Sequence, residues 1–283
     1  MRRLLIALVT IPWVSGCVGL FFQPYDKYVR TPDEIGLAYE DLTIETKDNL
    51  KLHAWYLPAS KPVCATILFL HGNAENISTH IGSVYWLPAR GFNVLLLDYR
   101  GYGSSQGSPS LSGFQADVDA AMSYLVGRPD VDKSRLLLFG QSIGAATAIY
   151  YAANGKQRNQ IHALVADSAF ASYRGIAREK MAGLWLTWPF QWIPLLTMSA
   201  TYDPQVAIAD VSPIPLLLVQ GDRDQIVPMT NGDRLFAAAR EPKQFWKVEG
   251  VGHINAFRLP EMRDRLVNYL HTNLCPTLSA TSD

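Results

Sequence analysis

The sequence of 283 residues lacks an excess of charge of either sign, because 25 lysines and arginines balance 25 aspartates and glutamates. A nucleic-acid-binding protein normally carries a basic face, so this balance argues against that class. The sequence also lacks internal repeats and long low-complexity segments. Its length allows one large domain or two small ones, and its 48% of hydrophobic residues suffices for a sizeable core.

Cysteine is scarce, and the first of the three cysteines lies in an unusual N-terminus. Cys17 follows two arginines, an apolar run over residues 4–14 and the small residues of "VSG". A basic start, an apolar stretch and small residues before a cleavage point are typical of a secretory signal. Small residues directly before a cysteine resemble the bacterial lipobox. We therefore predict a signal peptide over residues 1–16, lipidation of Cys17, and a lipid-anchored linker over residues 17–40.

The alternative for this N-terminus is a transmembrane helix, because residues 4–22 are uncharged and mostly apolar. Pro12, Gly16 and Gly19 weaken such a helix. Under either interpretation the body of the protein is exported and attached to a membrane. Val18 is not the aspartate that, by resemblance to lipoprotein sorting rules, would retain the protein at the inner membrane. We expect the bacterial cell envelope, on the periplasmic side of the outer membrane.

The rest of the chain alternates between strand and helix patterns. Eight segments have the length and composition of strands, at residues 42–48, 50–58, 64–70, 92–99, 135–140, 162–169, 215–221 and 243–250. Most are continuous apolar runs, which suit strands covered on both faces of a parallel sheet. Helical patterns lie between them at residues 111–126, 143–153, 230–239 and 260–274. The order predicts an α/β fold with a mostly parallel, doubly wound sheet, which begins with an antiparallel hairpin turning at Asp48-Asn49.

The segment 170–210 interrupts this alternation, between the sixth and seventh predicted strands. Met181, Trp185, Trp188 and Trp192 are spaced four, three and four residues apart, which predicts one face of a helix. We interpret the segment as an inserted helical cap. Its aromatic stripe either packs the cap onto the body or walls a pocket for an acyl chain, and we assign the three tryptophans to the substrate pocket.

The other two cysteines lie in the predicted domain, residues 41–275, which a flexible tail follows at 276–283. Cys64 begins a strand and Cys275 follows the last helix. In the predicted fold both positions lie at the sheet edge opposite the expected active site. They form a disulfide, which an exported compartment permits, or they remain two buried thiols.

"GQSIG" at residues 140–144 matches the G-x-S-x-G nucleophile elbow. The turn from strand to helix in this motif is so tight that the positions two before and two after the serine must be nearly bare. The Ser142 backbone is then strained, and its hydroxyl stands above the sheet. The pattern alone is weak. Here it follows an apolar strand and opens an apolar helix, as the mechanism requires.

A serine hydroxyl needs a base, which is usually a histidine oriented by a carboxylate. In this fold the chain order is serine, carboxylate, histidine. His253 lies in a glycine-rich loop after the last strand, whereas His271 lies inside the final helix. Asp222 and Asp224 compete for the acid in "QGDRDQ". We favour Asp224, because the first residues after the strand still complete the turn and leave Asp222 a structural role.

"LFLHGN" ends the third predicted strand, and the loop there should supply one N–H of an oxyanion hole. We assign this N–H to Asn73 and its partner to Ile143, the residue after the serine. Gly72 lets the chain turn toward the site, and His71 is interpreted as a structural hydrogen-bonding group. No metal or organic cofactor is required.

Four motifs, "HGNAEN", "LLLDYRGYGSSQG", "GQSIGAATA" and "GDRDQIVP", together resemble one branch of the α/β-hydrolase superfamily. That branch includes eukaryotic α/β-hydrolase-domain depalmitoylases and lysophospholipases and many membrane-attached bacterial homologues. The resemblance implies the α/β-hydrolase fold and a Ser142–Asp224–His253 triad that acts on ester or thioester bonds. It suggests structural roles for Asp98 and Arg100. The last motif departs from the branch, with "GVGH" where "GGGH" is common.

The sequence as a whole predicts a carboxylic-ester hydrolase working through an acyl-enzyme, with a small-molecule or lipid-like ester as substrate. Thioesterase and serine peptidase activities remain open, because both share acyl transfer to serine. A non-catalytic envelope lipoprotein that binds a ligand or a partner protein is the alternative of a different class.

Overall fold

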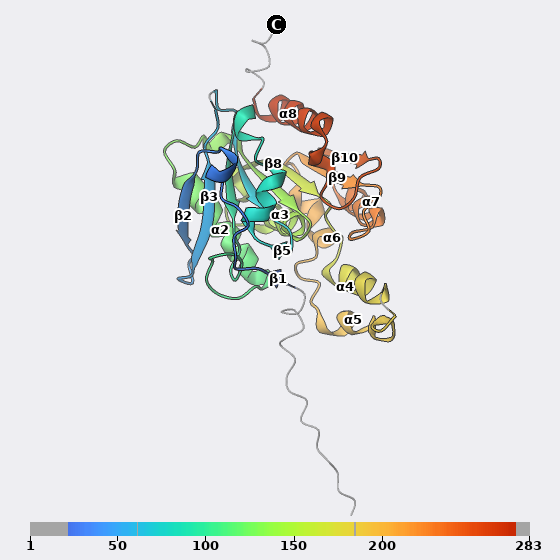
Figure 1. Ribbon diagram of the computed structural model, residues 1–283. Coiled ribbons are helices and arrows are strands. Elements are labelled where there is room, and N and C mark those ends of the chain that lie inside the picture. Colours follow the sequence, from blue (N-terminus) through green and yellow to red (C-terminus); the bar gives the residue numbers. More distant parts are fainter. Residues whose placement is uncertain (1–21, 61, 184, 276–283) are drawn as a thin grey trace, which may run out of the picture.

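The computed structural model describes residues 22–60, 62–183 and 185–275. The predicted signal peptide, Cys17 and the tail at 276–283 lie outside the described residues. Figure 1 shows one sheet flanked by helices, with a small helical insertion at the lower right.

The central sheet has eight strands, as predicted. They are β2 (Glu40–Glu45), β3 (Lys51–Leu57), β4 (Ala65–Leu70), β6 (Phe92–Leu97), β7 (Leu136–Gln141), β8 (Ile161–Asp167), β9 (Leu216–Gly221) and β10 (Lys243–Val248). Their spatial order is β10-β9-β8-β7-β4-β6-β3-β2. The pairs β2·β3 and β3·β6 are antiparallel and the other neighbours are parallel. The predicted fold class, with its N-terminal hairpin, is confirmed.

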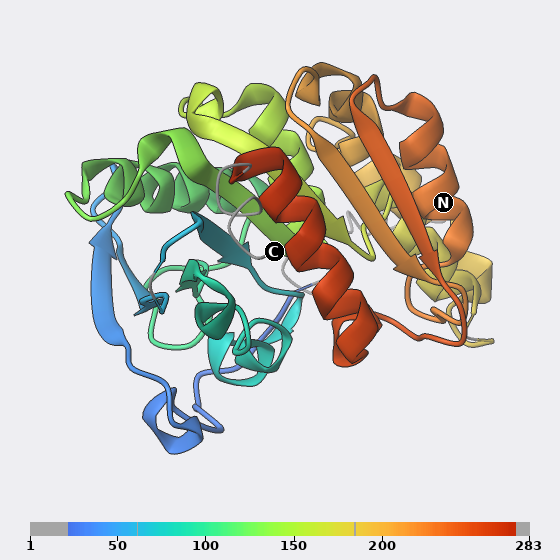
Figure 2. The ribbon, with the colours of Figure 1, turned by 90° about the horizontal axis from the view of Figure 1, so that it is seen from above.

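Helices cover both faces of the sheet because most strands are apolar on both sides. One face packs against α2 (Leu111–Gly127), α3 (Ile143–Asn154) and α7 (Met229–Ala238). The other face packs against α1 (Ile77–His80) and α8 (Pro260–Leu274), and Figure 2 shows α8 lying over the sheet in nearly the same direction as β9 and β10. The four predicted helices agree with α2, α3, α7 and α8 to within one residue at each end.

A second, two-stranded sheet joins the N-terminal end of the described chain to the loop after β4. Its strands are β1 (Gln23–Pro24) and β5 (Ala74–Glu75), which pair in parallel. Asn76 reinforces the junction, because its Nδ2 donates to the carbonyls of Tyr25 and Lys27 at 2.9 Å each. The N-terminal segment is therefore built into the body of the fold.

The insertion between β8 and β9 contains α4 (Tyr173–Ala182), α5 (Ile193–Thr197) and α6 (Pro204–Ala207). The prediction that Met181, Trp185, Trp188 and Trp192 share one helix face is wrong. Helix α4 ends at Ala182, a 3-10 turn occupies Trp188–Phe190, and α5 begins only at Ile193. Gly183 and the two prolines of this stretch, which suit helix ends and first turns, explain the interruption.

Cys64 and Cys275 form a disulfide between the start of β4 and the end of α8, with Cα atoms 5.7 Å apart. Both cysteines are buried. The crosslink lies at the amino end of β4, whereas the predicted active-site loops follow the carboxyl ends of the strands.

Replacing Cys64 and Cys275 together by alanine should lower the free energy of unfolding by about 2–5 kcal/mol, because the crosslink closes a loop with a sequence separation of 211 residues. Guanidinium unfolding of the wild type and the variant, each with and without a reductant, measures the effect. The reductant should destabilise only the wild type. Equal unfolding midpoints in all four samples would contradict the prediction.

Candidate active site

Ser142 lies between the end of β7 and the start of α3, with φ 55° and ψ −115°. This backbone conformation is strained for any residue but glycine. It persists because the chain turns within one residue, which the flanking glycines permit. A Cβ on Gly144 would overlap the carbonyl oxygen of Leu70, and a Cβ on Gly140 would overlap that of Gly144. The two glycines of G-x-S-x-G are therefore required by close backbone contact.

His253 is paired with Asp224. The Nδ1 atom of His253 lies 2.7 Å from Oδ2 of Asp224, and Oδ1 of that carboxylate accepts the N–H groups of Ile226 and Val227 at 2.8 Å each. The carboxylate is thus fixed on both oxygens. It holds the proton of His253 on Nδ1, which leaves Nε2 free to act as a base. Asp222 has another role, since it accepts the N–H of Gly250 at 2.7 Å.

Asp167 and Ser168, at the end of β8, connect the serine to the histidine loop. The N–H of Ser142 donates to the carbonyl of Asp167 at 2.9 Å. The hydroxyl of Ser168 donates to the Asp167 carboxylate at 3.0 Å and accepts the N–H of Ile254 at 3.1 Å. Both Ser168 and Ile254 have positive φ, 56° and 48°. Two residues thus position the elbow and the loop that carries His253.

Asp167 is fully buried, and this burial raises the pKa of its carboxyl to about 6, although hydrogen bonds from Gln141 and Ser168 act in the opposite direction. The Gln141 side chain donates to Oδ2 at 2.8 Å. Sequence reasoning missed Asp167 and Ser168. The signal that could have found them is a carboxylate and a hydroxyl placed directly after a buried strand, beside the strand that leads to the serine.

The loop after β4 runs close beside Ser142. A Cβ built on Gly72 would lie 3.8 Å from Cβ of Ser142 and 3.0 Å from Cε1 of His80. Asn73 follows, and its carbonyl oxygen accepts the Tyr102 hydroxyl at 2.9 Å. Ile143 is the first residue of α3. Of the two residues predicted for the oxyanion hole, Ile143 thus directly follows Ser142 in the chain, and Asn73 follows the glycine that lies beside it.

His80 supports this loop from behind. Its Nε2 lies 3.0 Å from the carbonyl oxygen of Ala74, and its ring is 5.3 Å from that of His71. Burial lowers the pKa of His80, so the ring is neutral and donates this hydrogen bond. The Nδ1 atom of His71 lies 2.7 Å from the carbonyl oxygen of Gly72, a structural contact of the predicted kind. Nothing in the sequence pattern distinguishes His80.

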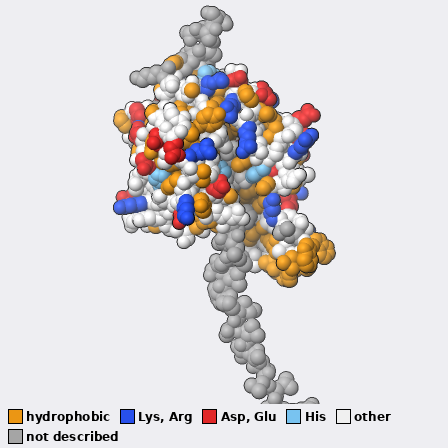
Figure 3. Space-filling view, in the orientation of Figure 1, with side chains coloured by type: hydrophobic (Ala, Val, Ile, Leu, Met, Phe, Trp, Pro, Cys, Tyr) orange, Lys and Arg blue, Asp and Glu red, His pale blue; other side chains and the backbone are white. Residues whose placement is uncertain are grey.

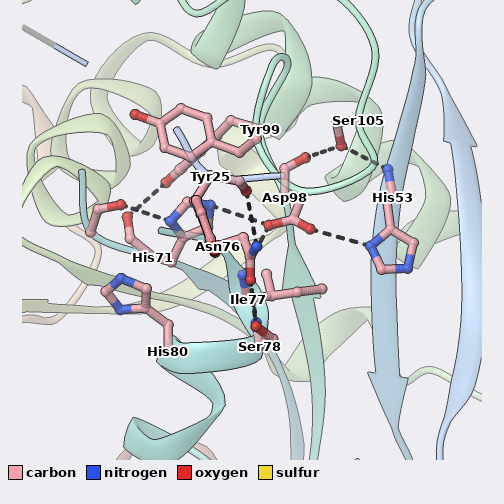
Figure 4. Close-up of polar contacts among 12 residues, drawn as sticks. Tyr25, His53, His71, Asn76, Ile77, Ser78, His80, Asp98, Tyr99 and Ser105 are labelled. Atoms are coloured by element: carbon pink, nitrogen blue, oxygen red, sulfur yellow. Dashed lines mark hydrogen bonds and ion pairs between the residues drawn. The ribbon is translucent and has the colours of Figure 1, made fainter. Parts of the chain in front are cut away.

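Asp98 is the centre of the polar cluster in Figure 4. Its fully buried carboxylate accepts the N–H of Ile77 and the hydroxyl of Tyr28, both at 2.9 Å, and lies 3.2 Å from Nδ1 of His53. These partners come from α1, the N-terminal segment and β3. Arg100 forms an ion pair with Asp117, with Nη2 2.8 Å from Oδ1. Both residues are structural, and Asp98 fixes the start of α1 behind the loop that carries Asn73.

The tryptophans assigned to a substrate pocket are more than half exposed. Trp185, Trp188 and Trp192 are 88%, 59% and 53% exposed, which is incompatible with the walls of a closed pocket. The reason is the interrupted helix, which leaves no continuous stripe to turn inward. A cavity of about 880 Å³ does exist, between β2, α2 and α3, but neither Ser142 nor His253 lines it.

Among the described residues, no group of three or more histidine, cysteine, aspartate or glutamate side chains is arranged to hold a metal ion. The helices formed by those residues are all too short or too polar to cross a membrane.

Comparison with known proteins places this geometry in a family. The model of the family described as serine aminopeptidase, S33, matches residues 61–214. The protein YfhR of Escherichia coli O157:H7 is 37% identical over 266 residues, covering 92% of this chain and 89% of YfhR. The α/β hydrolase domain-containing protein WAV2 of Arabidopsis thaliana is 34% identical over 233 residues, or 76% of this chain and 72% of WAV2.

Among solved structures, the esterase Pf2001 of Pyrococcus furiosus has a similar fold, with a TM-score of 0.74 and 23% identity over 89% of this chain and 98% of the esterase. Fold and site define an α/β hydrolase, as the sequence motifs predicted. The chain belongs to the α/β-hydrolase family described as serine aminopeptidase, S33.

The buried carboxyl of Asp167 predicts a specific dependence of stability on pH. Its pKa in the folded chain is about 6, against an ordinary value of 3.8. Since folding favours the protonated form, its contribution to stability is complete below pH 3.8 and is lost as the pH rises through about 6.

Asp167→Asn should remove this dependence. Urea unfolding from pH 4 to 8 measures the free energy of unfolding of both proteins. The value for the wild type minus the value for Asp167→Asn should fall as the pH rises and then level off above about pH 6. Asp26→Asn, at an exposed aspartate, is the control and should give a curve parallel to the wild type. A difference between wild type and Asp167→Asn that stays constant with pH would contradict the assignment.

Proposed function

We propose that the protein is a serine hydrolase that cleaves carboxylic esters or thioesters through an acyl-enzyme. One observation carries the proposal: Nδ1 of His253 lies 2.7 Å from the Asp224 carboxylate, and the loop of His253 is connected to Ser142. The connection runs from Ile254 through the Ser168 hydroxyl and Asp167 to the strained backbone of Ser142. The side chains proposed as nucleophile, acid and base, Ser142, Asp224 and His253, follow β7, β9 and β10 at the carboxyl ends of these strands.

In the proposed mechanism the Ser142 hydroxyl attacks the carbonyl carbon while Nε2 of His253 takes its proton. The N–H groups of Asn73 and Ile143 bind the oxyanion, and the positive end of the α3 dipole favours the same charge. The leaving alkoxide or thiolate takes the proton from His253. Water then attacks the acyl-enzyme by the same path and releases the acid. Asp224 stabilises the imidazolium throughout.

We favour esters over aminoacyl peptides because three carboxylates, after β8, after β9 and at the base of the cap, already have hydrogen-bond partners. An aminopeptidase needs a carboxylate to bind the substrate ammonium group. Asp167 and Asp224 already accept hydrogen bonds within the site. Asp203, at the base of the cap, accepts from the Ser172 hydroxyl at 2.9 Å and from the N–H of Tyr173 at 2.8 Å. These three carboxylates are therefore committed to structural or catalytic roles.

We also propose that the protein acts in the cell envelope, anchored through a lipid on Cys17. The anatomy of residues 1–17 supports export. The disulfide between Cys64 and Cys275 is a second, independent support, since such bonds persist in oxidising compartments.

Ser142→Ala should lower kcat for p-nitrophenyl esters by about 10⁶-fold, and Asp224→Asn by about 10⁴-fold. Labelling by a fluorophosphonate probe should disappear in Ser142→Ala. Asp222→Asn is the matched control, two residues from the acid, and should stay within about tenfold of the wild type. Undiminished ester hydrolysis or labelling in Ser142→Ala would refute the mechanism, and a wild type that never reacts with the probe would favour a non-catalytic binding protein.

Relative rates on three acyl donors test the substrate class. The wild type should cleave p-nitrophenyl esters and acyl thioesters with kcat/KM at least roughly 100-fold above that for aminoacyl p-nitroanilides. Ser142→Ala controls for background hydrolysis of each donor. A preference for the anilides, removed by the same variant, would keep the serine mechanism and make the protein a peptidase.

A further inference from the structure

The tip of the cap is an exposed apolar surface. Residues 181–202 contain no aspartate, glutamate, lysine, arginine or histidine. Seven large apolar side chains there are 45–88% exposed, and we call them the cap face: Trp185, Leu186, Trp188, Phe190, Trp192, Leu195 and Leu196. Figure 3 shows apolar side chains gathered at this lower right tip. Soluble monomers rarely expose so many adjacent apolar groups without a binding partner.

The cap face is held in shape by contacts on its inner side. Pro194 and Met198 are buried. The carbonyl of Met198 accepts a hydrogen bond from Nε of Arg174 in α4. The Thr187 hydroxyl donates to the carbonyl of Met181 at 2.8 Å. The inward residues thus attach the segment to the body, and the outward ones remain available to a partner.

The composition of the cap face fits a lipid bilayer. Tryptophan is enriched where a protein meets the membrane interface, since its ring is apolar and its N–H is polar. Arg178 and Lys180 are exposed on the neighbouring helix α4, and cations at this level are attracted to anionic lipid headgroups. Turns divide residues 181–202 into short helical pieces, which suits a surface that lies in the plane of the membrane interface.

The N-terminal end of the described chain lies on the same side of the molecule. Figure 1 shows β1 and the cap helices α4 and α5 at the lower side, away from α8. The ring of Phe22 is 5.0 Å from that of Phe114, which stacks on Tyr99 at 4.3 Å. Tyr173, the first residue of α4, belongs to the same buried hydrophobic cluster as these three rings.

This position limits how far the cap can be from a membrane anchor. Cys17 precedes Phe22 by five residues, and five extended residues span at most about 18 Å. A lipid on Cys17 would therefore keep this side of the molecule next to the bilayer. The high local concentration of lipid would favour even a weak contact of the cap face.

We propose that the cap face docks on the lipid bilayer, with its tryptophans at the headgroup level and its leucines among the acyl chains. The cap follows β8 at the sheet edge that carries Ser142, so this orientation turns the active-site edge toward the membrane surface. The docking is a property of the surface and does not depend on the hydrolysis proposed for Ser142.

Quenching by brominated lipid tests the docking. The full-length protein is incorporated into vesicles of phosphatidylcholine and phosphatidylglycerol, with or without bromine on the acyl chains. Tryptophan emission of the wild type is compared with that of the variant Trp185→Phe/Trp188→Phe/Trp192→Phe. Both proteins also carry Trp13→Phe, so that the N-terminal apolar run adds no emission. Because Trp55, Trp86 and Trp246 are buried in the body, bromine should quench the protein with an intact cap face much more than the triple variant.

Two substitutions that introduce charge test how much the exposed leucines contribute to the free energy of docking. Leu186→Glu with Leu196→Glu, at side chains 67% and 78% exposed, should fold normally and reduce the docking equilibrium constant by about tenfold or more per leucine. Val63→Glu is the matched control, since Val63 is 40% exposed but adjoins the disulfide at the other end of the sheet. Its quenching should equal that of the wild type.

Two outcomes would overturn the docking proposal. Equal quenching of the wild type and the triple tryptophan variant means that the cap face does not reach lipid. A dimer that Leu186→Glu/Leu196→Glu dissociates, without lipid quenching in the wild type, assigns the surface to a second copy of the chain. Repeating the quenching with Ser142→Ala separates the two proposals, because that variant should dock fully even though it lacks hydrolysis.

Discussion

The close approach of α3 to the end of β4 is the constraint on which the site depends. Gly144 lies so near the carbonyl oxygen of Leu70 that no side chain fits between them. This contact lets the chain reverse within one residue, which keeps Ser142 in a conformation that it would not adopt in a free peptide. The same contact brings the loop of Gly72 beside the serine. A single steric requirement thus positions both Ser142 and the loop expected to bind the oxyanion.

Around this contact, groups at the ends of several strands hold the other parts of the site in place. Ser168 connects the histidine loop to β8, and Asp224 is fixed by two backbone N–H groups besides His253. Asp98, on the other side of β4, connects α1 to the hairpin and the N-terminal segment. Groups held this way need little rearrangement during a reaction, and such preorganisation is a major source of catalytic power.

The sheet and its main helices were predictable because nearly every central strand is buried on both faces, so continuous apolar runs mark them plainly. The elbow was predictable because steric requirements act within five residues. Ser168 and His80 were not, since their roles depend on partners far along the chain; Ser168 and Ile254 are 86 residues apart. The cap failed for a different reason. The spacing of Trp185, Trp188 and Trp192 is that of a helix face, but turns at Gly183 and Pro189 interrupt the helix before the face can form.

The pairing of Gln23 and Pro24 with Ala74 and Glu75 has a mechanical consequence. Any force on the chain before Phe22 is borne first by the packing of Phe22 against Phe114 and by these few hydrogen bonds, which hold the residues that directly follow Asn73. Tension from an attachment point would therefore be transmitted to the rim of the site before it reached the core. With the lipid attachment proposed above, the stiffness of this short junction would set how much of that tension reaches the loop beside Ser142.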